Sequence, residues 1–295
     1  MSAHKAGFVN IIGNPNVGKS TLMNALVGER LSIITSKAQT TRHRILGIVN
    51  GEDFQMVISD TPGIIKPAYA LQESMMDFVR TALDDADVLI YMVEIGQKGL
   101  KDEAFLERIQ KTEVPVLLMI NKIDTSDQRT LEEKVDYWKD LLPRAEIFPI
   151  SALERFNIQP VFDRILELLP EGPPYFPKDQ LTDKPERFFV GEIIREKVLR
   201  HYKKEIPYSV EIEVEAFEEG VDLIRIGAVI MVERDSQKGI IIGHKGAALK
   251  RVGSEARKDL EAFFAKKVYL ELFVKVNKNW RSDSRQLRRF GYNSK

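Results

Sequence analysis

The sequence predicts an α/β fold, in which a doubly wound domain with a mostly parallel sheet is followed by a smaller α+β domain. Its 295 residues exceed the ~100–200 of a typical single domain. Up to about Leu169, short apolar runs alternate with amphipathic stretches, which is the pattern of strands and crossover helices. The charge then changes, because residues 234–295 carry 16 Lys and Arg against 6 Asp and Glu in a chain of formal net charge zero.

The first domain is expected to contain five strands joined by helices. Five apolar runs have the length of buried strands, at residues 8–12, 54–59, 88–94, 116–120 and 146–150. Helical segments lie between and after them, at residues 20–27, 71–83, 103–110, 130–142 and 158–168. Ligands of such sheets bind beyond the carboxyl ends of the strands, so functional residues are expected directly after these runs.

A proline-rich segment follows the last of these helices. Residues 170–177 contain four prolines, which can neither continue a helix nor pair inside a sheet. We therefore predict a first domain at residues 1–172, a linker at 173–186 and a second domain at 187–295. Within the second domain we expect a helix with its apolar face at Val190, Ile193, Ile194, Val198 and Tyr202, strands near 208–215, 224–233 and 268–276, and a helix from Ala247.

The composition excludes several classes of protein. A hydrophobic fraction of 43% and a charged fraction of 30% are typical of a soluble globular protein. Cysteine is absent, which excludes disulfides and thiolate metal sites and favours the reducing cytoplasm. The longest apolar runs, such as Val88–Val93, fall far below the ~20 residues that a membrane span needs. The basic C-terminal segment indicates a polyanionic partner, either nucleic acid or anionic lipid.

A phosphate-binding loop follows the first predicted strand. Residues 13–20 match GxxxxGK[ST] between a strand and a helix, where backbone N–H groups and the helix N-terminus can hold phosphates. Lys19 would reach the β and γ oxygens, and Ser20 would bind Mg²⁺. The motif does not separate ATP from GTP. The expected nucleotide contacts in this region are Gly13, Asn14, Pro15, Asn16, Val17, Gly18, Lys19, Ser20 and Thr21.

A second motif, Asp-Thr-Pro-Gly, follows the strand at residues 54–59. Alone it would be an ordinary turn, but together with the phosphate loop it indicates a carboxylate near Mg²⁺ and an N–H group for the γ-phosphate. We expect nucleotide contacts from Asp60, Thr61, Pro62, Gly63 and Ile64, with Asp60 as a metal ligand. Between the two motifs lies the polar segment 35–44, from which Thr41, or else Thr40, is expected to complete the metal shell.

The base is predicted to be read by the sequence Asn-Lys-Ile-Asp after the fourth strand. The Asp124 carboxylate can accept hydrogen bonds from N1 and the exocyclic amine of guanine, which adenine does not offer. Asn121 would reach the base edge, and the Lys122 stem would cover the base. The nucleotide contacts expected at this end are Asn121, Lys122, Ile123, Asp124, Ser151 and Ala152, and a backbone N–H of the Ser151-Ala152 pair can meet the guanine carbonyl. The motifs together predict a P-loop GTPase that binds GTP and GDP.

The position after Asp-Thr-Pro-Gly bears on the mechanism. Ile64 stands where Ras-like enzymes have a glutamine that orients the attacking water, and no other base replaces it. We therefore expect slow intrinsic hydrolysis, in which positioning and charge stabilisation by Lys19, Thr41 and Gly63 contribute most.

The second domain contains a GxxG turn in its basic part. In the sequence Gly-His-Lys-Gly, the backbone can approach nucleic-acid phosphates, and the following helix adds basic side chains. The expected RNA contacts are Gly243, His244, Lys245, Gly246, Lys250 and Arg251. Near the C-terminus we expect Trp280 to pack on the domain, and Arg285, Arg288 and Arg289 to be solvated or to face RNA.

With these motifs, the chain resembles the Era family of bacterial ribosome-assembly GTPases. The resemblance rests on GNPNVGKS, KAQTTRHR, DTPG, NKID, PYSVEIEVE, IIIGHKGAALKRVG and WRSDSRQLRRFGY, which span nearly the whole chain. It implies a type II KH domain, binding to the 3′ end of 16S rRNA, assistance in small ribosomal subunit assembly, and peripheral contact with the inner membrane. It also implies that Asn16 holds a K⁺ ion that contributes to catalysis.

Two other functions remain open at this point. The chain can be a GTPase that acts at the membrane surface through its basic C-terminal domain, or a GTP-metabolising enzyme whose basic domain is only structural. We expect a monomer that works as a switch, in which GTP orders the loops around Thr41 and Asp60 and thereby sets RNA affinity.

Overall fold

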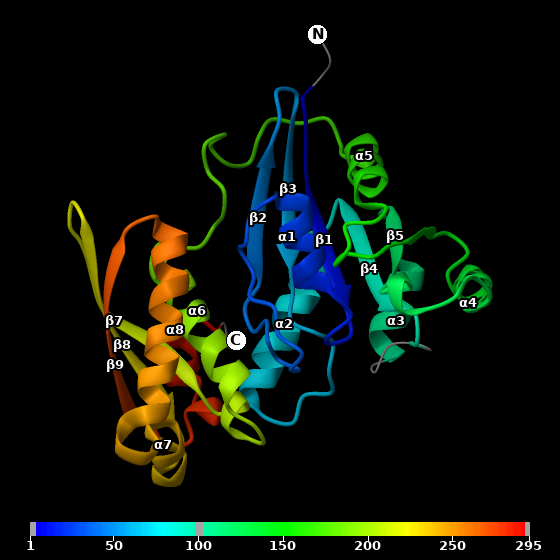
Figure 1. The fold of residues 1–295 in the computed structure, drawn as a ribbon. Helices are drawn as coiled ribbons and strands as arrows, with labels where there is room; N and C mark the ends of the chain where they lie inside the picture. Colours follow the sequence, from blue (N-terminus) through cyan, green and yellow to red (C-terminus); the bar gives the residue numbers. More distant parts are fainter. Residues whose placement is uncertain (1–3, 98–102, 293–295) are drawn as a thin grey trace. The chain divides into compact units, whose positions relative to one another are not determined.

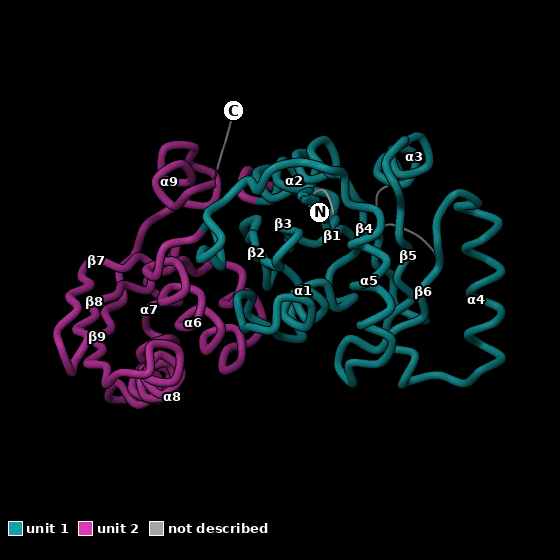
Figure 2. Tube along the Cα trace, turned by 90° about the horizontal axis from the view of Figure 1, so that it is seen from above, with its two compact units in different colours: residues 1–68, 72–183 teal, residues 69–71, 184–295 magenta. Residues whose placement is uncertain are grey.

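The protein separates into two compact units in a computed structural model that describes residues 4–97 and 103–292 (Figures 1 and 2). Unit 1 comprises residues 1–68 and 72–183, and unit 2 comprises residues 69–71 and 184–295. The change between units falls at Asp183 and Lys184, inside the segment predicted to be a linker.

Unit 1 is built on a six-stranded sheet in the order β2-β3-β1-β4-β5-β6. The strands are β1 (Lys5–Gly13), β2 (Ile45–Asn50), β3 (Phe54–Asp60), β4 (Val88–Glu94), β5 (Val116–Asn121) and β6 (Glu146–Pro149). Neighbouring strands are parallel except β2 with β3. The five predicted strands are present, whereas β2 was missed because its apolar run is short and interrupted by a glycine, which weakens a strand signal.

Helices cover both faces of this sheet. They are α1 (Lys19–Val27), α2 (Ala70–Asp84), α3 (Glu103–Lys111), α4 (Gln128–Leu141) and α5 (Ile158–Leu168). Figure 2 shows α1 and α5 on one face and α2 and α3 on the other, which confirms the predicted doubly wound arrangement. The side chain of Asp127 caps α4 by accepting from the Thr130 N–H at 2.8 Å, and Trp138 is fully buried edge-on to Tyr91 on β4.

The strand register brings the functional motifs to one edge. Ile11 pairs with Asp60, and Gly13 at the end of β1 pairs with Met92 of β4. On the other side of β4, Glu94 pairs with Asn121 at the end of β5. Because these strands are parallel, the loops that follow β1, β3 and β5 emerge at the same edge of the sheet.

The first part of the predicted linker runs along unit 1. The buried side chain of Gln55 accepts hydrogen bonds from the backbone N–H groups of Tyr175 at 2.7 Å and Phe176 at 2.9 Å. Further along, the Ile48 N–H donates to the Leu181 carbonyl at 2.8 Å. This segment is therefore attached to the β2 side of the sheet by its own backbone groups.

Unit 2 has an α+β arrangement with a three-stranded sheet in the order β7-β8-β9. Its elements are α6 (Glu186–His201), β7 (Glu211–Glu219), β8 (Leu223–Val232), α7 (Asp235–Ile242), α8 (Ala247–Phe264), β9 (Lys267–Val276) and α9 (Ser284–Arg289). β7 and β8 are antiparallel, and β8 and β9 are parallel. The predicted apolar face of α6 is buried in the core with residues of α8 and the sheet. Helices α7 and α9 were not predicted.

The C-terminal segment belongs to the core of unit 2. Trp280 is fully buried, donates from its indole Nε1 to the Ser209 carbonyl at 3.1 Å, and meets Phe290 edge-to-face, which confirms the predicted packing. The Tyr292 hydroxyl donates to the Glu211 carboxylate at 2.9 Å. Within residues 4–97 and 103–292, no helix has the length and apolar composition needed to cross a membrane.

Candidate nucleotide and nucleic-acid sites

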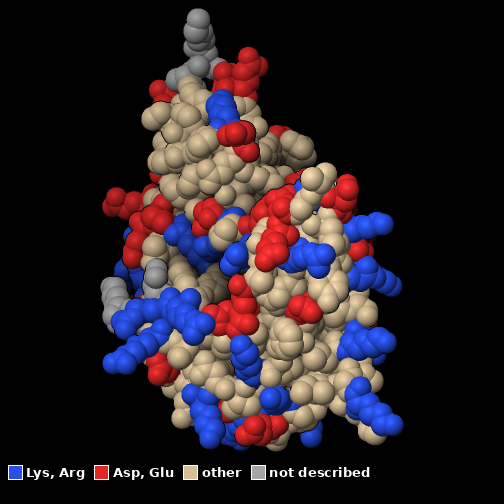
Figure 3. Space-filling model, turned by 90° about the vertical axis from the view of Figure 1, so that its left-hand side faces the viewer, with Lys and Arg blue, Asp and Glu red and all other residues tan. Residues whose placement is uncertain are grey.

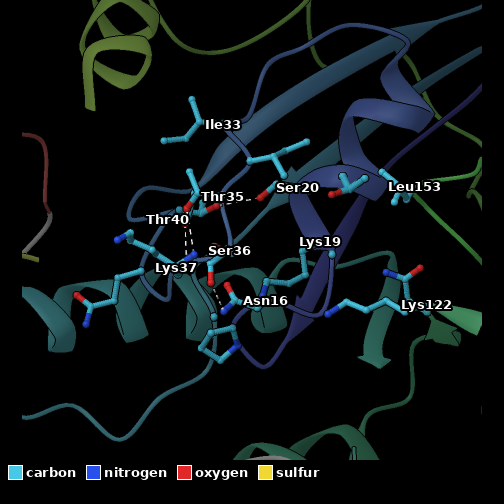
Figure 4. Close-up of a pocket in the computed structure, with 18 of the residues that line it drawn as sticks. Asn16, Lys19, Ser20, Ile33, Thr35, Ser36, Lys37, Thr40, Lys122 and Leu153 are labelled. Atoms are coloured by element: carbon cyan, nitrogen blue, oxygen red, sulfur yellow. Dashed lines mark hydrogen bonds between the residues drawn. The ribbon is translucent and has the colours of Figure 1, made fainter. Parts of the chain in front are cut away.

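A cavity of about 350 Å³ lies at the carboxyl ends of the strands in unit 1. Figure 4 shows Thr35, Ser36 and Lys37 on one side of it, with Lys122 and Leu153 on the other. The lining consists of Pro15, Asn16, Gly18, Lys19, Ser20, Thr21, Ile33, Ile34, Thr35, Ser36, Lys37, Gln39, Thr40, Thr41, Thr61, Gly63, Asn121, Lys122, Asp124, Thr125 and Leu153. All the nucleotide motifs except the Ser151-Ala152 pair therefore contribute to one cavity. Leu153, which directly follows that pair, lines the cavity instead.

Several predicted contacts are not part of this lining. They are Gly13, Asn14, Val17, Asp60, Pro62, Ile64, Ile123, Ser151 and Ala152. The sequence analysis in turn missed eight lining residues, which are Ile33, Ile34, Thr35, Ser36, Lys37, Gln39, Thr125 and Leu153. Leu153 and Thr125 could have been found because each directly follows a predicted motif, and Leu153 is 74% exposed. Thr35, Ser36, Lys37 and Gln39 lie in the polar segment 35–44, from which only a threonine was chosen.

Lys19 is held inside the phosphate loop. Its ammonium group donates to the carbonyls of Gly13 at 3.2 Å and Asn14 at 2.8 Å. Burial lowers the pKa of Lys19 to about 8, and the nearby Asp60 carboxylate acts in the opposite direction. A buried ammonium group that is held by two neutral carbonyls is electrostatically suited to receive phosphate oxygens.

Asn121 connects the phosphate loop to the base end of the cavity. Its Nδ2 donates to the Val17 carbonyl at 2.7 Å, and its Oδ1 accepts from the Ala152 N–H at 2.9 Å. Gly18 makes this approach possible, because it has a φ of +104° and an added Cβ would lie 2.3 Å from Asn121 Nδ2. The side chain thus joins three loops, and its contact with the base stays a prediction.

Three oxygen-bearing side chains from separate segments meet beside the phosphate loop. The Ser20 hydroxyl donates to the Asp60 carboxylate at 2.6 Å, and the Thr41 hydroxyl lies 3.0 Å from Ser20 and 3.3 Å from Asp60. Burial raises the pKa of Asp60, and its Oδ1 has no hydrogen-bond partner within the described part of the chain. Mg²⁺ prefers oxygen ligands of this kind, so the residues fit the predicted metal site.

The two threonines considered for this site have different surroundings. Whereas Thr41 reaches Asp60, the Thr40 hydroxyl donates to the Lys37 carbonyl at 2.7 Å and lies 2.6 Å from the Thr35 hydroxyl. The geometry therefore favours Thr41 over Thr40.

The Asp-Thr-Pro-Gly segment is bound to the first strand and its loop. The Thr61 hydroxyl donates to the Ile11 carbonyl at 2.6 Å, and the Ile64 N–H donates to the Gly13 carbonyl at 3.0 Å. Ile64 itself is fully buried, so its side chain provides no polar group to the cavity. Gly63 lines the cavity beside Pro15.

At the base end, Asp124 is exposed on the cavity wall and Lys122 forms an ion pair with Glu94. The two predicted N–H donors have partners within the protein, since Ser151 donates to Phe156 at 3.3 Å and Ala152 donates to Asn121. A contact between either N–H group and the guanine carbonyl therefore stays a prediction.

The GxxG turn joins α7 to α8 in unit 2. Gly243 has a φ of +70°, and an added Cβ would lie 2.7 Å from the Ala248 Cβ, so a side chain here is both strained and crowded. His244 and Lys245 are exposed at its tip. Beside it lies a groove of about 350 Å³ between α8 and β9, lined by Gly246, Leu249, Lys250, Gly253, Ser254, Arg257, Leu270 and Leu272. An apolar groove with a basic lining can receive unstacked bases and their phosphates.

The positive charge of this region is partly neutralised. Carboxylates from outside residues 234–295 pair with basic side chains of this segment, because Lys266 pairs with Glu219, Lys275 with Glu215, and Arg289 with Glu213. Figure 3 likewise shows Asp and Glu side chains lying among Lys and Arg on one face. Counting charges along the sequence therefore overstated the available positive charge, whereas His244, Lys245 and Lys250 are exposed beside the groove.

Comparisons with known proteins match both units. Residues 8–122 match the family described as 50S ribosome-binding GTPase, and residues 205–281 match the KH domain family. A crystal structure of Era in complex with MgGDPNP and nucleotides 1506–1542 of 16S ribosomal RNA is 39% identical, covering 99% of this chain and 100% of that chain, with a TM-score of 0.94. The chain belongs to the Era family of GTPases. A tyrosine-to-alanine variant of Era from Aquifex aeolicus, bound to GDP and AlF4⁻, is also 39% identical, covering 98% of this chain and all of that chain, with a TM-score of 0.93.

Membership of the Era family confirms the predicted fold and enzyme class. The chain is a GTPase with a type II KH domain after its P-loop GTPase domain.

Proposed function

We propose that this protein is a GTP-hydrolysing switch that binds the 3′ end of 16S rRNA through its KH domain and assists assembly of the small ribosomal subunit. The observation that carries the proposal is the joint presence of a cavity lined by the nucleotide motifs and a basic-lined KH groove. The solved Era structure with MgGDPNP and a 16S rRNA segment supports the same pairing of ligands.

In the nucleotide site, each residue has a role that follows from its position. Lys19 would neutralise the β and γ oxygens, while backbone N–H groups of residues 13–18 other than Pro15 would surround the phosphates. Ser20, Thr41 and Asp60 would hold Mg²⁺, which offsets the negative charge of the phosphates. Asp124 would accept from guanine, while Asn121 holds the base loop against the phosphate loop.

Hydrolysis at this site depends on positioning. The buried Ile64 provides no carboxamide for the attacking water, so the residues that contribute are Lys19, Gly63 and Thr41, which stabilise charge and hold the γ-phosphate. We therefore propose that intrinsic turnover is slow and that a partner or a monovalent cation accelerates it.

The central experiment measures RNA binding in both nucleotide states. A fluorescent RNA that corresponds to the 3′ end of 16S rRNA is titrated with protein bound to a non-hydrolysable GTP analogue or to GDP. Affinity is expected to differ between the two states, because nucleotide-dependent ordering of the Thr41 and Asp60 loops is proposed to control the KH domain. Equal affinity in both states would exclude the switch.

The KH contribution is tested by variants in the GxxG turn. Gly243→Asp adds a carboxylate at a strained position, and Lys245→Glu changes charge at an exposed one, so both are expected to weaken RNA binding. A plot of log affinity against log salt concentration should also become less steep by about 1 for Lys245→Glu. Gly239→Ala is the control, because an added Cβ there meets no atom within 4 Å. RNA binding by the two GxxG variants at the level of Gly239→Ala would contradict the KH site.

We also propose that K⁺ stimulates hydrolysis through Asn16. This residue lines the cavity with a φ of +66°, and its Nδ2 donates to the Ser36 carbonyl at 3.0 Å. We expect wild-type GTP hydrolysis to be roughly 10²-fold faster in K⁺ than in Na⁺. Asn16→Gly removes the carboxamide without backbone strain and should abolish this difference. Asn157→Gly is a matched control, since Asn157 also has a positive φ and donates to a backbone carbonyl. Equal rates of the wild-type enzyme in K⁺ and Na⁺ would refute this role.

Peripheral contact with the inner membrane, a cytoplasmic location and a monomeric state remain proposals from the sequence. Flotation with anionic liposomes, with and without competing RNA, tests the membrane contact, because both polyanions would use the same basic region.

A further inference from the structure

The loop that carries Thr41 is anchored at both ends. It leaves α1 after Val27 and reaches β2 at Ile45. At its beginning, Asn24 on α1 accepts from the N–H groups of Leu31 and Ser32 at 3.0 Å each, and its Nδ2 donates to the Ser32 carbonyl at 2.8 Å. This end of the loop is therefore tied to the helix that follows the phosphate loop.

At the other end, Arg44 is held by a network of side chains. Its two terminal nitrogens donate to the Asp85 carboxylate at 2.6 and 2.9 Å, and Nε donates to the Ser59 hydroxyl at 2.7 Å. One terminal nitrogen also donates to the Asn10 Oδ1 at 3.0 Å. A guanidinium group bound as a fork to a carboxylate has a defined orientation as well as a defined position.

The partners of Arg44 are themselves fixed. Asn10 on β1 is fully buried, and its Nδ2 donates to Asp85 at 2.7 Å and to the Ala82 carbonyl at 2.6 Å. Ser59 on β3 is also fully buried, and the Arg44 side chain is only 12% exposed. The network thus connects the loop to β1, β3 and the C-terminal end of α2. It lies outside the nucleotide cavity.

The geometry connects this network to the metal-binding residues. Ile45 on β2 pairs with Asp60 on β3, and Arg44 is the residue directly before Ile45. Three residues before Arg44, the Thr41 hydroxyl lies 3.3 Å from Asp60 and 3.0 Å from Ser20. Three residues span at most about 10 Å, so the position of Arg44 limits where Thr41 can lie.

We propose that Arg44, held by Asp85, is a positioning residue for GTP hydrolysis, which fixes the end of the loop so that Thr41 faces Ser20 and Asp60. The inference rests on the proposed role of Thr41 in binding the metal and the γ-phosphate. Arg44 does not line the cavity and would act through the chain. Small displacements of groups that contact the reacting phosphate have large kinetic effects, of about 10²-fold for ~1 Å.

The test replaces members of the network and separates GTP from GDP. Arg44→Lys keeps the charge but cannot form the fork, and Asp85→Asn removes the acceptor charge. Each is expected to lower kcat by roughly tenfold to a hundredfold and to weaken binding of a non-hydrolysable GTP analogue, with GDP affinity unchanged. The double variant should have the same kcat and the same affinity for the GTP analogue as the single variants, because both changes break one network.

Arg80→Lys is the matched control. Arg80 lies on α2 and pairs with Glu73 and Asp77 in the same helix, and it is 40% exposed. It should leave kcat and the ratio of analogue to GDP affinity at wild-type values. Thermal unfolding of all variants shows whether a loss of activity reflects instability, and measurements are made well below the lowest melting temperature.

The outcomes distinguish the inference from the function on which it rests. If Arg44→Lys lowers the melting temperature but leaves kcat and the affinity ratio unchanged, Arg44 is only a structural residue and the inference fails. If Thr41→Ala changes kcat and the affinity ratio and Arg44→Lys does not, the inference alone fails. If Thr41→Ala has no effect either, the proposed role of Thr41 fails with it.

Discussion

Asp124→Asn is expected to weaken GTP and GDP binding by roughly 10²–10⁴-fold, since two charge-assisted hydrogen bonds of about 1.5–3 kcal/mol each are lost or reversed. Asparagine presents an N–H donor where the carboxylate presented an acceptor, which matches the 2-oxo group of xanthine rather than the amine of guanine. The variant should therefore bind XDP and hydrolyse XTP. Titration with fluorescent diphosphates, followed by hydrolysis assays at saturating nucleotide, measures both changes.

Asp127→Asn provides the matched control for this exchange. Asp127 lies in the same loop, and its side chain caps α4 by accepting from the Thr130 N–H. Asparagine caps helices as well as aspartate, so stability and base preference should stay unchanged. Wild-type affinity of Asp124→Asn for GDP, or an equal change in Asp127→Asn, would show that another residue reads the base.

Gly63→Ala is expected to reduce GTP hydrolysis by on the order of 10²-fold. The added Cβ would lie 2.6 Å from the Pro15 backbone nitrogen and 2.7 Å from its Cα, which are distances that neither backbone tolerates. The two loops must then separate, and the bond from the Ile64 N–H to the Gly13 carbonyl is strained or lost. Because GDP has no γ-phosphate, its affinity should change much less than that of a GTP analogue.

Single-turnover hydrolysis and the two affinities measure the effect of Gly63→Ala. The control is Gly172→Ala, where an added Cβ meets no atom within 4 Å and no positive φ has to be maintained. A hydrolysis rate for Gly63→Ala that equals the rate of Gly172→Ala would mean that the close approach to Pro15 has no role in γ-phosphate contact.

Tertiary structure was needed wherever the partners of a residue lie far away in the chain. Asn121 was predicted to reach the base, but the structure uses both ends of its amide inside the protein, one of them on Val17, 104 residues away. Arg44 belonged to a segment predicted to be a polar loop, and its network depends on Asp85, 41 residues away. No local pattern contains this information, because each contact exists only once the sheet has assembled.

The same reason explains two features that the sequence did not reveal. The balance of 16 basic against 6 acidic residues in the C-terminal segment does not include Glu213, which folding places beside Arg289. The proline-rich segment is predicted to be a linker, and its backbone also binds Gln55 in unit 1 through Tyr175 and Phe176. Prolines predicted correctly that regular structure ends there, but not what the irregular chain would contact.

The sequence by itself determined the enzyme class, the order of the two folds and the motifs that form the nucleotide cavity, because a phosphate loop or a GxxG turn is built from backbone groups of adjacent residues. Only the tertiary structure decided which side chains complete that cavity. It brought Thr41 rather than Thr40 to Asp60, and it placed Leu153 on the wall. Those choices depend on how β1, β3 and β5 align, and on the anchors at Asn24 and Arg44, whose distances are set when the whole domain packs.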